Sequence, residues 1–330
     1  MNNEFLGIVK TKNKNKTEYI ACTYYERFFP LKSEHVFLRG KKINTTIDSV
    51  LDALRIGKEM NLSFSEIMRI EKEDIMAPIE EPRNLIYIES NFKNNPKERY
   101  SCKPIFFSED KKTIIKPYQS IMINESDLID LKVHLGIMIA RDIDADTRIE
   151  SIKDFIGGYF IATDIISKRR EIENKSFFLK RKEYYEKENV TDFKPIGPVI
   201  SPFINPEREI FLIRKRDSDI SKIQRAKISE IKIFPQEIIF YIKEQLKENE
   251  MKSKRKKDSL KINKLNKGDI ILCGTPSSRE KEKYSTLEIL LSGGKERFLR
   301  KLKEEKIYAR KKDYFYPVIE NLGYQEIEIT

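Results

Sequence analysis

The chain has 330 residues, of which 39% are hydrophobic and 10% aromatic, so it can bury a sizeable core and is not a disordered protein. Three cysteines without a CxxC pair, a first segment without a secretory pattern and the lack of a long apolar run predict a cytoplasmic protein with no membrane partner. The formal net charge of +11 invites a nucleic-acid role, but the densest basic run, residues 252–257, has no aromatic residue for base stacking, so we do not expect a nucleic-acid partner.

The first part of the chain mixes strand-like and helix-like patterns. Residues 17–21 have the polar and apolar mixture of a strand, whereas apolar residues within 47–60 recur close to helical spacing. A second helix is expected after Ser63, with Ile67 among its buried residues.

Two prolines within residues 77–82 then interrupt regular structure. We place the domain boundary there, which predicts a small N-terminal domain over residues 1–80 and a larger domain over residues 81–330.

The second part of the chain is rich in strand patterns. Strands are expected at residues 84–88, 131–139, 160–166, 211–214 and 231–234, and helices at residues 147–155 and 235–247. Gly157 and Gly158 are expected to stop the first of these helices. Because strands outnumber helices and do not alternate with them regularly, the pattern predicts a β-rich α+β fold.

Asp164 stands out because it is the single acid within the apolar strand at residues 160–166. A buried carboxylate without a partner is costly in free energy. The sequence therefore predicts a cationic group next to Asp164.

Seven local patterns follow one another in a fixed order. They are Ala77-Pro78-Ile79 with Pro82, Asn91 to Glu98, Pro104 to Phe107, Asp130 to Leu135, Gly158-Tyr159 before Thr163-Asp164, Pro195-Ile196-Gly197-Pro198, and Leu265 to Pro276. In this order they resemble the motifs of the fumarylacetoacetate hydrolase (FAH) family, over roughly residues 77–302.

The resemblance implies an FAH-type mixed β-roll in the C-terminal domain, a small N-terminal α/β domain and a homodimer. Members of this family hydrolyse, decarboxylate or isomerise small oxo acids, with Mg²⁺ or Mn²⁺ as a Lewis acid held by carboxylates. A small-molecule oxo acid or a related metabolite is therefore the expected ligand.

The chain departs from the family at the metal-binding and lid positions. Lys132 and His134 replace two carboxylate ligands and leave Asp164 alone, so we expect no metal cofactor. Asn95 stands where the family has its general-base His, and an amide cannot take a proton from water at neutral pH. Glu98 keeps its place.

The resemblance assigns roles to nine residues. The expected catalytic residues are Glu98, Lys132, Asp164, Glu171 and Thr275, and the expected substrate-binding residues are Asn95, His134, Lys168 and Lys175. Lys175 shares with Lys187 the candidacy for the family's lysine before the Pro-x-Gly-Pro turn. Lys132 and Asp164 are expected to form a coupled buried pair, either as a substitute for the metal or as a simple filling of its place.

Two readings of function remain open. In the first, the protein is a divergent, metal-independent lyase, hydrolase or isomerase in which Lys132 stabilises an enolate and Glu98 or Glu171 moves a proton. In the second, it is a catalytically inactive FAH homologue that acts as a binding or scaffold subunit. The sequence leaves open whether the chain is an enzyme.

Overall fold

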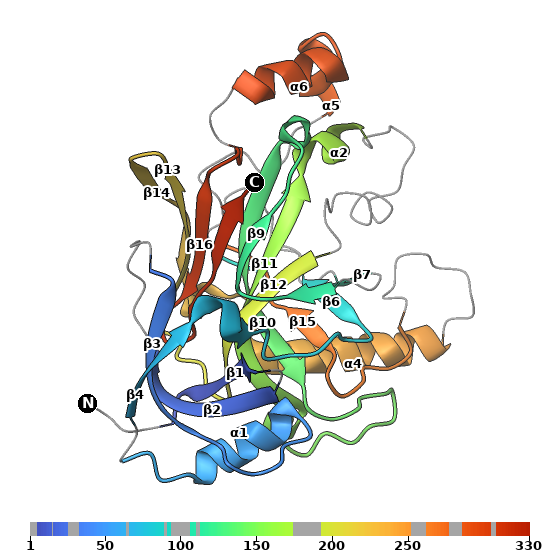
Figure 1. Ribbon diagram of the computed structural model, residues 1–330. Coiled ribbons are helices and arrows are strands. Elements are labelled where there is room, and N and C mark those ends of the chain that lie inside the picture. The colour runs from blue at the N-terminus through green and yellow to red at the C-terminus, as the bar shows by residue number, and fades with distance from the viewer. Residues whose placement is uncertain are drawn as a thin grey trace.

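The computed structural model is dominated by strands, which form two sheets (Figure 1). It describes residues 5–14, 16–25, 33–63, 66–88, 91–93, 106–109, 113–173, 193–251, 262–276, 286–304 and 308–330. The strands are β1 (Gly7–Asn13), β2 (Lys16–Tyr25), β3 (His35–Lys42), β4 (Glu66–Glu71), β5 (Ile75–Met76), β6 (Leu85–Ile88), β7 (Phe106–Glu109), β8 (Thr113–Ile115), β9 (Tyr118–Ile121), β10 (Ile129–Ile139), β11 (Ile156–Ser167), β12 (Phe193–Ser201), β13 (Glu209–Arg216), β14 (Asp219–Lys227), β15 (Ile270–Leu272), β16 (Tyr314–Ile319), β17 (Gly323–Tyr324) and β18 (Glu326–Ile329). The helices are α1 (Val50–Glu59), α2 (Lys168–Glu173), α4 (Pro235–Met251), α5 (Thr286–Leu291) and α6 (Lys295–Glu304), with 3₁₀ turns η1 (Lys72–Asp74), η2 (Glu125–Asp127), η3 (Ile152–Phe155) and η4 (Ile228–Glu230).

The larger sheet of the described chain has twelve strands in the order β4-β3-β2-β1-β12-β11-β10-β15-β6-β7, with β5 on β1 and β8 on β12. The smaller sheet has six strands in the order β14-β13-β16-β18-β9, with β17 on β16. Neighbours are mostly antiparallel, but β15–β6, β12–β8 and β18–β9 are parallel. The predicted β-rich α+β fold with mixed sheets is confirmed.

Strand β10 has two different faces because successive side chains point to opposite sides of a sheet. Leu131, Val133 and Leu135 belong to the main core, which also contains buried residues of β13, β14, β16, β18 and α4. Met138 belongs to a second cluster with Phe160 of β11 and residues of α1. Polar residues at the even-numbered positions of β10 therefore lie on the face turned away from the smaller sheet.

The first 80 residues extend the larger sheet. Strand β1 pairs with the second half of β12 through Ile8↔Ile200 and Val9↔Val199, so the sheet is continuous across residue 80. Gly7 permits this approach, since a Cβ added there would lie 2.4 Å from the carbonyl oxygen of Ile200. The division into domains at residue 80 stays a prediction.

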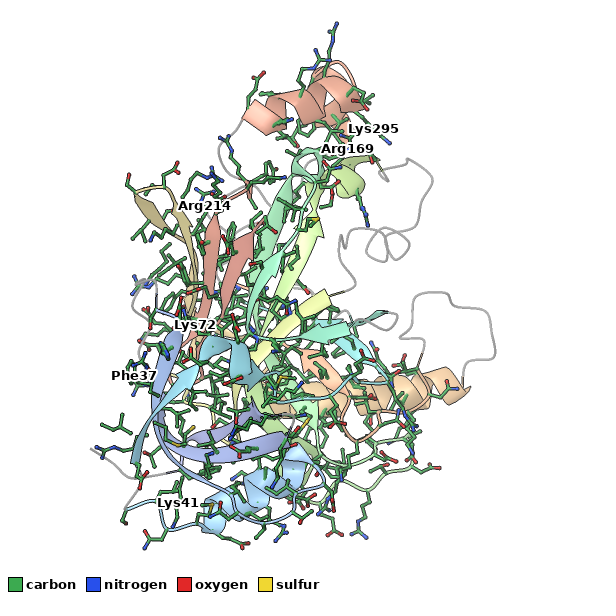
Figure 2. The ribbon with its side chains drawn as sticks, viewed as in Figure 1. Phe37, Lys41, Lys72, Arg169, Arg214 and Lys295 are labelled. Carbon is green, nitrogen blue, oxygen red and sulfur yellow. The ribbon has the colours of Figure 1, made fainter. Side chains whose placement is uncertain are left out.

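An ion pair with a buried lysine ties the N-terminal strands to the smaller sheet. Lys72 Nζ donates to Glu326 Oε2 at 2.7 Å and lies 5.6 Å and 5.8 Å from the ring centres of Tyr118 and Tyr324. Figure 2 labels Lys72 in this region between the N-terminal strands and the smaller sheet. The aromatic rings supply cation–π stabilisation to an ammonium that is almost withdrawn from water.

The helices at residues 47–60 and 235–247 are confirmed as α1 and α4. Ser49 caps α1, because its side chain accepts from the backbone N–H of Asp52. None of the helices in the described ranges is long and apolar enough to cross a membrane.

Three expected elements are wrong. The helix after Ser63 is strand β4, where Ile67 is 70% exposed, because pairing with β3 imposes a period of two on this segment. The helix at 147–155 is reduced to η3, and Gly158 lies inside β11, where a Cβ would meet Ile200 of β12 at 2.6 Å. Residues 231–234 form only an isolated bridge, from Ile231 to Phe92.

Candidate active site

A row of charged residues crosses three neighbouring strands of the larger sheet. Lys132 of β10 stands directly opposite Asp164 of β11. The β11–β12 register, which pairs Ala162 with Ile196, continues to Asp164 and Lys194. Directly opposed residues share a face of an antiparallel sheet. Lys132, Asp164 and Lys194 therefore form one row, which we call the charged row.

Asp164 is 4% exposed, and both of its carboxylate oxygens have partners. Oδ1 accepts hydrogen bonds from Lys194 Nζ and from the hydroxyl of Tyr87, the latter at 2.8 Å. Oδ2 lies 3.0 Å from Nε2 of the buried His134. The predicted cation beside Asp164 is confirmed, and it is Lys194.

Lys194 is among the most buried charged residues described, at 1% exposed. Its ammonium lies 4.7 Å from the centre of the Tyr87 ring, so it has a carboxylate on one side and an aromatic face on another. The carbonyl oxygen of the next residue, Pro195, accepts a hydrogen bond from Nε2 of the fully buried Gln325, at 3.0 Å. Gln325 also binds the carbonyl oxygen of Gly197 at 3.2 Å. This clamp fixes the start of β12 and with it the direction of Lys194.

Lys132 differs from Lys194 in its surroundings. It is partly buried and forms no hydrogen bond or ion pair with any residue of the described chain. The expected coupled pair of Lys132 and Asp164 is therefore not the contact that the structure shows. Lys132 shares the row with Asp164, while Lys194 makes the ion pair. Lys132 is therefore paired across the strands with a residue whose carboxylate already has other partners.

A second lysine and carboxylate, Lys168 and Asp130, lie where β11 ends and β10 begins. Lys168, at the start of α2, is buried, and its Nζ lies 3.9 Å from Oδ2 of Asp130. The backbone of Glu171 is part of α2, but its side chain lies outside the described residues.

Thr275 follows β15 and is held from the side of the smaller sheet. Its hydroxyl oxygen accepts from Gln224 Nε2 at 3.2 Å, and Gln224 Oε1 accepts from the backbone N–H of Val133 at 3.1 Å. Gln224 thus joins the Thr275 turn to β10 next to Lys132. These contacts fix the turn that follows β15.

Three expected site residues, Asn95, Glu98 and Lys175, lie outside the described residues. The structure brings together Lys132, His134 and Asp164, and places Lys168 and Thr275 on adjoining elements. The roles assigned to all of these residues stay predictions.

Sequence analysis missed Lys194 and Tyr87. Lys194 is the one charged residue between Phe193 and Ser201, so the argument that singled out Asp164 also applies to it. Tyr87 carried no comparable signal, because a tyrosine in a strand is most often a packing residue.

The donor set does not fit Mg²⁺ or Mn²⁺. Such ions require several oxygen ligands, whereas Asp164 is the single carboxylate in a row that also holds Lys132 and Lys194. The ammonium of Lys194 already occupies Oδ1 of Asp164. Among the described residues no group of three or more His, Cys, Asp or Glu side chains is placed to hold a metal. The residues of the row therefore do not fit the family's metal, and the absence of a cofactor stays a prediction.

Comparisons with known proteins agree with this fold. The family model described as fumarylacetoacetate (FAA) hydrolase C-terminal matches residues 83–328. A fumarylacetoacetate hydrolase from psychrophilic Exiguobacterium antarcticum has a TM-score of 0.62 and 16% identity, with 98% of this chain and 99% of that chain covered. A 5-carboxymethyl-2-hydroxymuconate delta-isomerase from Mycobacterium smegmatis has a TM-score of 0.56 and 15% identity, with 98% of each chain covered.

A 2-hydroxyhepta-2,4-diene-1,7-dioate isomerase from Mycobacterium marinum has a TM-score of 0.58 and 14% identity, with 98% of each chain covered. The search of curated proteins finds no match. These structures share the fold of this chain, which confirms the expected FAH-type architecture. Because the family model covers most of the sequence, the chain belongs to the fumarylacetoacetate hydrolase family.

Proposed function

We propose that the protein is a metal-independent enzyme that enolises a small oxo acid or a related metabolite, in an isomerase, lyase or hydrolase type of reaction. The observation that carries the proposal is Lys132, a partly buried ammonium with no ion-pair partner in the described chain. A charge withdrawn from water is costly unless an opposite charge meets it. The carboxylate or enolate of a ligand would supply that opposite charge.

The charge balance around the row supports an anionic ligand. Lys132, Lys168 and Lys194 contribute three ammonium groups, whereas Asp130 and Asp164 contribute two carboxylates. One positive charge is therefore in excess among these five residues. A monoanionic ligand would neutralise it.

The proposed roles of Lys132 and Asp164 are argued from the described site, and the role of Glu98 or Glu171 from the resemblance to the family. When the carbon next to a keto group loses a proton, negative charge develops on the keto oxygen. Lys132 binds that oxygen. Asp164 acts as a positioning residue, since Lys194 and Tyr87 hold its Oδ1 and His134 lies against its Oδ2. Glu98 or Glu171 takes the proton and returns it. Two of the similar structures are named as isomerases, which supports enol chemistry on this fold.

The test is hydrogen–deuterium exchange at the carbon next to the keto group, followed by NMR in D₂O with excess chelator present. The substrates are a panel of small 2-oxo acids. The wild-type protein is expected to accelerate exchange, and Lys132→Met to lower the catalysed rate by about 100-fold, the usual effect of losing one group that stabilises an oxyanion. Lys132→Arg keeps the charge and is expected to retain part of the rate.

Lys41→Met is the matched control, because Lys41 is an exposed lysine of β3 on the outer part of the same sheet. It should leave the exchange rate unchanged. Equal rates for the wild-type protein and Lys132→Met across the panel would refute the proposal and favour the scaffold-subunit alternative. Loss of the activity with chelator would refute its metal independence. A homodimer and a cytoplasmic location stay predictions.

A further inference from the structure

The helices near the C-terminus form a small lobe with a core of its own. Buried residues of α2, α5, α6 and the adjoining loops make a cluster separate from the main cores: Leu128, Ile172, Ile289, Phe298, Leu299, Leu302 and Tyr308. In Figure 1 α5 and α6 lie at one end of the molecule, and α1 lies at the other. We call α5, α6 and residues 308–312 the helical lobe.

The helical lobe includes most of one of the two strongly basic stretches of the sequence, residues 295–312, the other being residues 252–257. Residues 295–312 contain nine basic and three acidic residues, a net charge of +6 out of the +11 of the whole sequence. More than half of the net charge thus belongs to 18 consecutive residues. A block of this kind produces a strong local potential that attracts anions.

These charges face solvent because α6 is amphipathic. Phe298, Leu299 and Leu302 turn inward to the lobe's core, which leaves the basic residues outside. Arg297, Arg300, Lys301 and Lys303 are exposed and form no ion pair with any residue that the structure describes. Figure 2 shows the lobe with Lys295 labelled near its junction with α2.

Two neighbouring leucines are exposed on α5, the helix that precedes α6 in the chain. Leu290 is 55% exposed and Leu291 is 78% exposed, at the end of α5. The turn at Gly293 and Gly294 then leads directly into α6. Two large apolar side chains and a basic helix therefore share one end of the molecule.

We propose that the helical lobe binds an anionic lipid surface, with Leu290 and Leu291 entering the interface and α6 contacting the headgroups. Apolar side chains beside lysines and arginines are the usual features of such surface binding. The basic residues of the segment are mostly lysines, which protein–protein interfaces tend to exclude. The aromatic residues of the lobe's core, Phe298 and Tyr308, are buried, so nucleic-acid bases find no stacking surface there.

This proposal revises the expectation of no membrane partner. That expectation was based on the lack of a segment that could span a bilayer, and adsorption to a surface needs no spanning segment.

The test is co-sedimentation of the full-length protein with vesicles of phosphatidylcholine alone or with about 30% phosphatidylserine. Binding is expected for the anionic vesicles and should weaken between about 0.05 and about 0.3 M salt, because salt screens the attraction. A basic residue near such a surface contributes about fivefold in affinity, so Arg297→Gln, Arg300→Gln and Lys301→Gln together should weaken binding by about 100-fold. Leu290→Ser with Leu291→Ser should weaken it by at least about tenfold.

The control variant combines Lys12→Gln, Lys16→Gln and Lys41→Gln, which removes the same charge from exposed positions of β1, β2 and β3. It should bind like the wild-type protein. Equal loss in this control, equal binding to both vesicle types, or binding to a single-stranded oligonucleotide but not to vesicles would each overturn the proposal.

Discussion

The ion pair of Asp164 and Lys194 is expected to be energetically coupled. Both side chains are almost fully buried, at 6% and 1% exposed. At an effective dielectric constant of about 20, opposite unit charges in contact attract by about 4 kcal/mol. Removing one partner also leaves the other charge buried, so we expect Lys194→Met and Asp164→Asn each to lower the free energy of unfolding by about 3–5 kcal/mol.

The loss for Lys194→Met is expected at the lower end of that range, because Tyr87 and His134 remain in contact with the Asp164 carboxylate. The double variant, in which neither charge remains, should recover about 2–4 kcal/mol of the combined loss. The assay is urea unfolding of the four proteins, with the midpoint and slope of each transition.

A second double-mutant cycle, matched to the first, combines Lys132→Met with Asp164→Asn. Because Lys132 makes no contact with Asp164 that the structure shows, its coupling should be less than half of that of Lys194. A coupling below about 0.5 kcal/mol between Asp164 and Lys194 would refute the reasoning, and so would a larger coupling to Lys132.

Four further predictions concern metal content, thiol reactivity, the pH dependence of stability and the clamp on β12. Elemental analysis of the purified protein should find no stoichiometric Mg²⁺ or Mn²⁺, and one such ion per chain that is lost with Asp164→Ala would contradict this. Burial raises the pKa of the Cys22 thiol to about 12 from 9.0 and also raises the pKa of Cys273, so a Cys102→Ser variant should resist thiol reagents at pH 8 until it is unfolded. The stability that the protonated Cys22 contributes should be complete below pH 9.0 and lost as the pH rises towards 12, which pH-dependent unfolding would show. Gln325→Leu should cost about 2–4 kcal/mol in urea unfolding, because three buried carbonyl oxygens lose a donor, whereas Gln119→Leu on the exposed part of β9 should cost little.

Sequence reasoning reached the site through the cost of burying charge. It required a cation beside Asp164, and this requirement was correct. It chose Lys132, because Lys132 stands at one of the positions where the family has its metal ligands. The partner on β12 depends on the pairing of strands some 30 residues apart, which one sequence does not reveal.

The errors in secondary structure have a similar origin. The apolar residues around Ile67 are compatible with a helix or a strand over so short a segment, and the neighbouring strand β3 decides between them. Gly158 was interpreted as a helix stop, but its use is to let β12 come close to β11, a contact between distant segments.

The continuity of the larger sheet across residue 80 affects how the protein can be divided. Strand β12 carries Lys194, and its second half is bordered by β11 on one side and by β1 on the other. A fragment limited to residues 83–328, the part that the family model matches, would expose the backbone N–H and C=O groups of Val199 and Ile200 as a free sheet edge. Such edges recruit strands from other molecules, so the fragment should aggregate rather than fold as an independent unit. A truncation to the matched region would therefore remove a neighbour of the strand that carries Lys194.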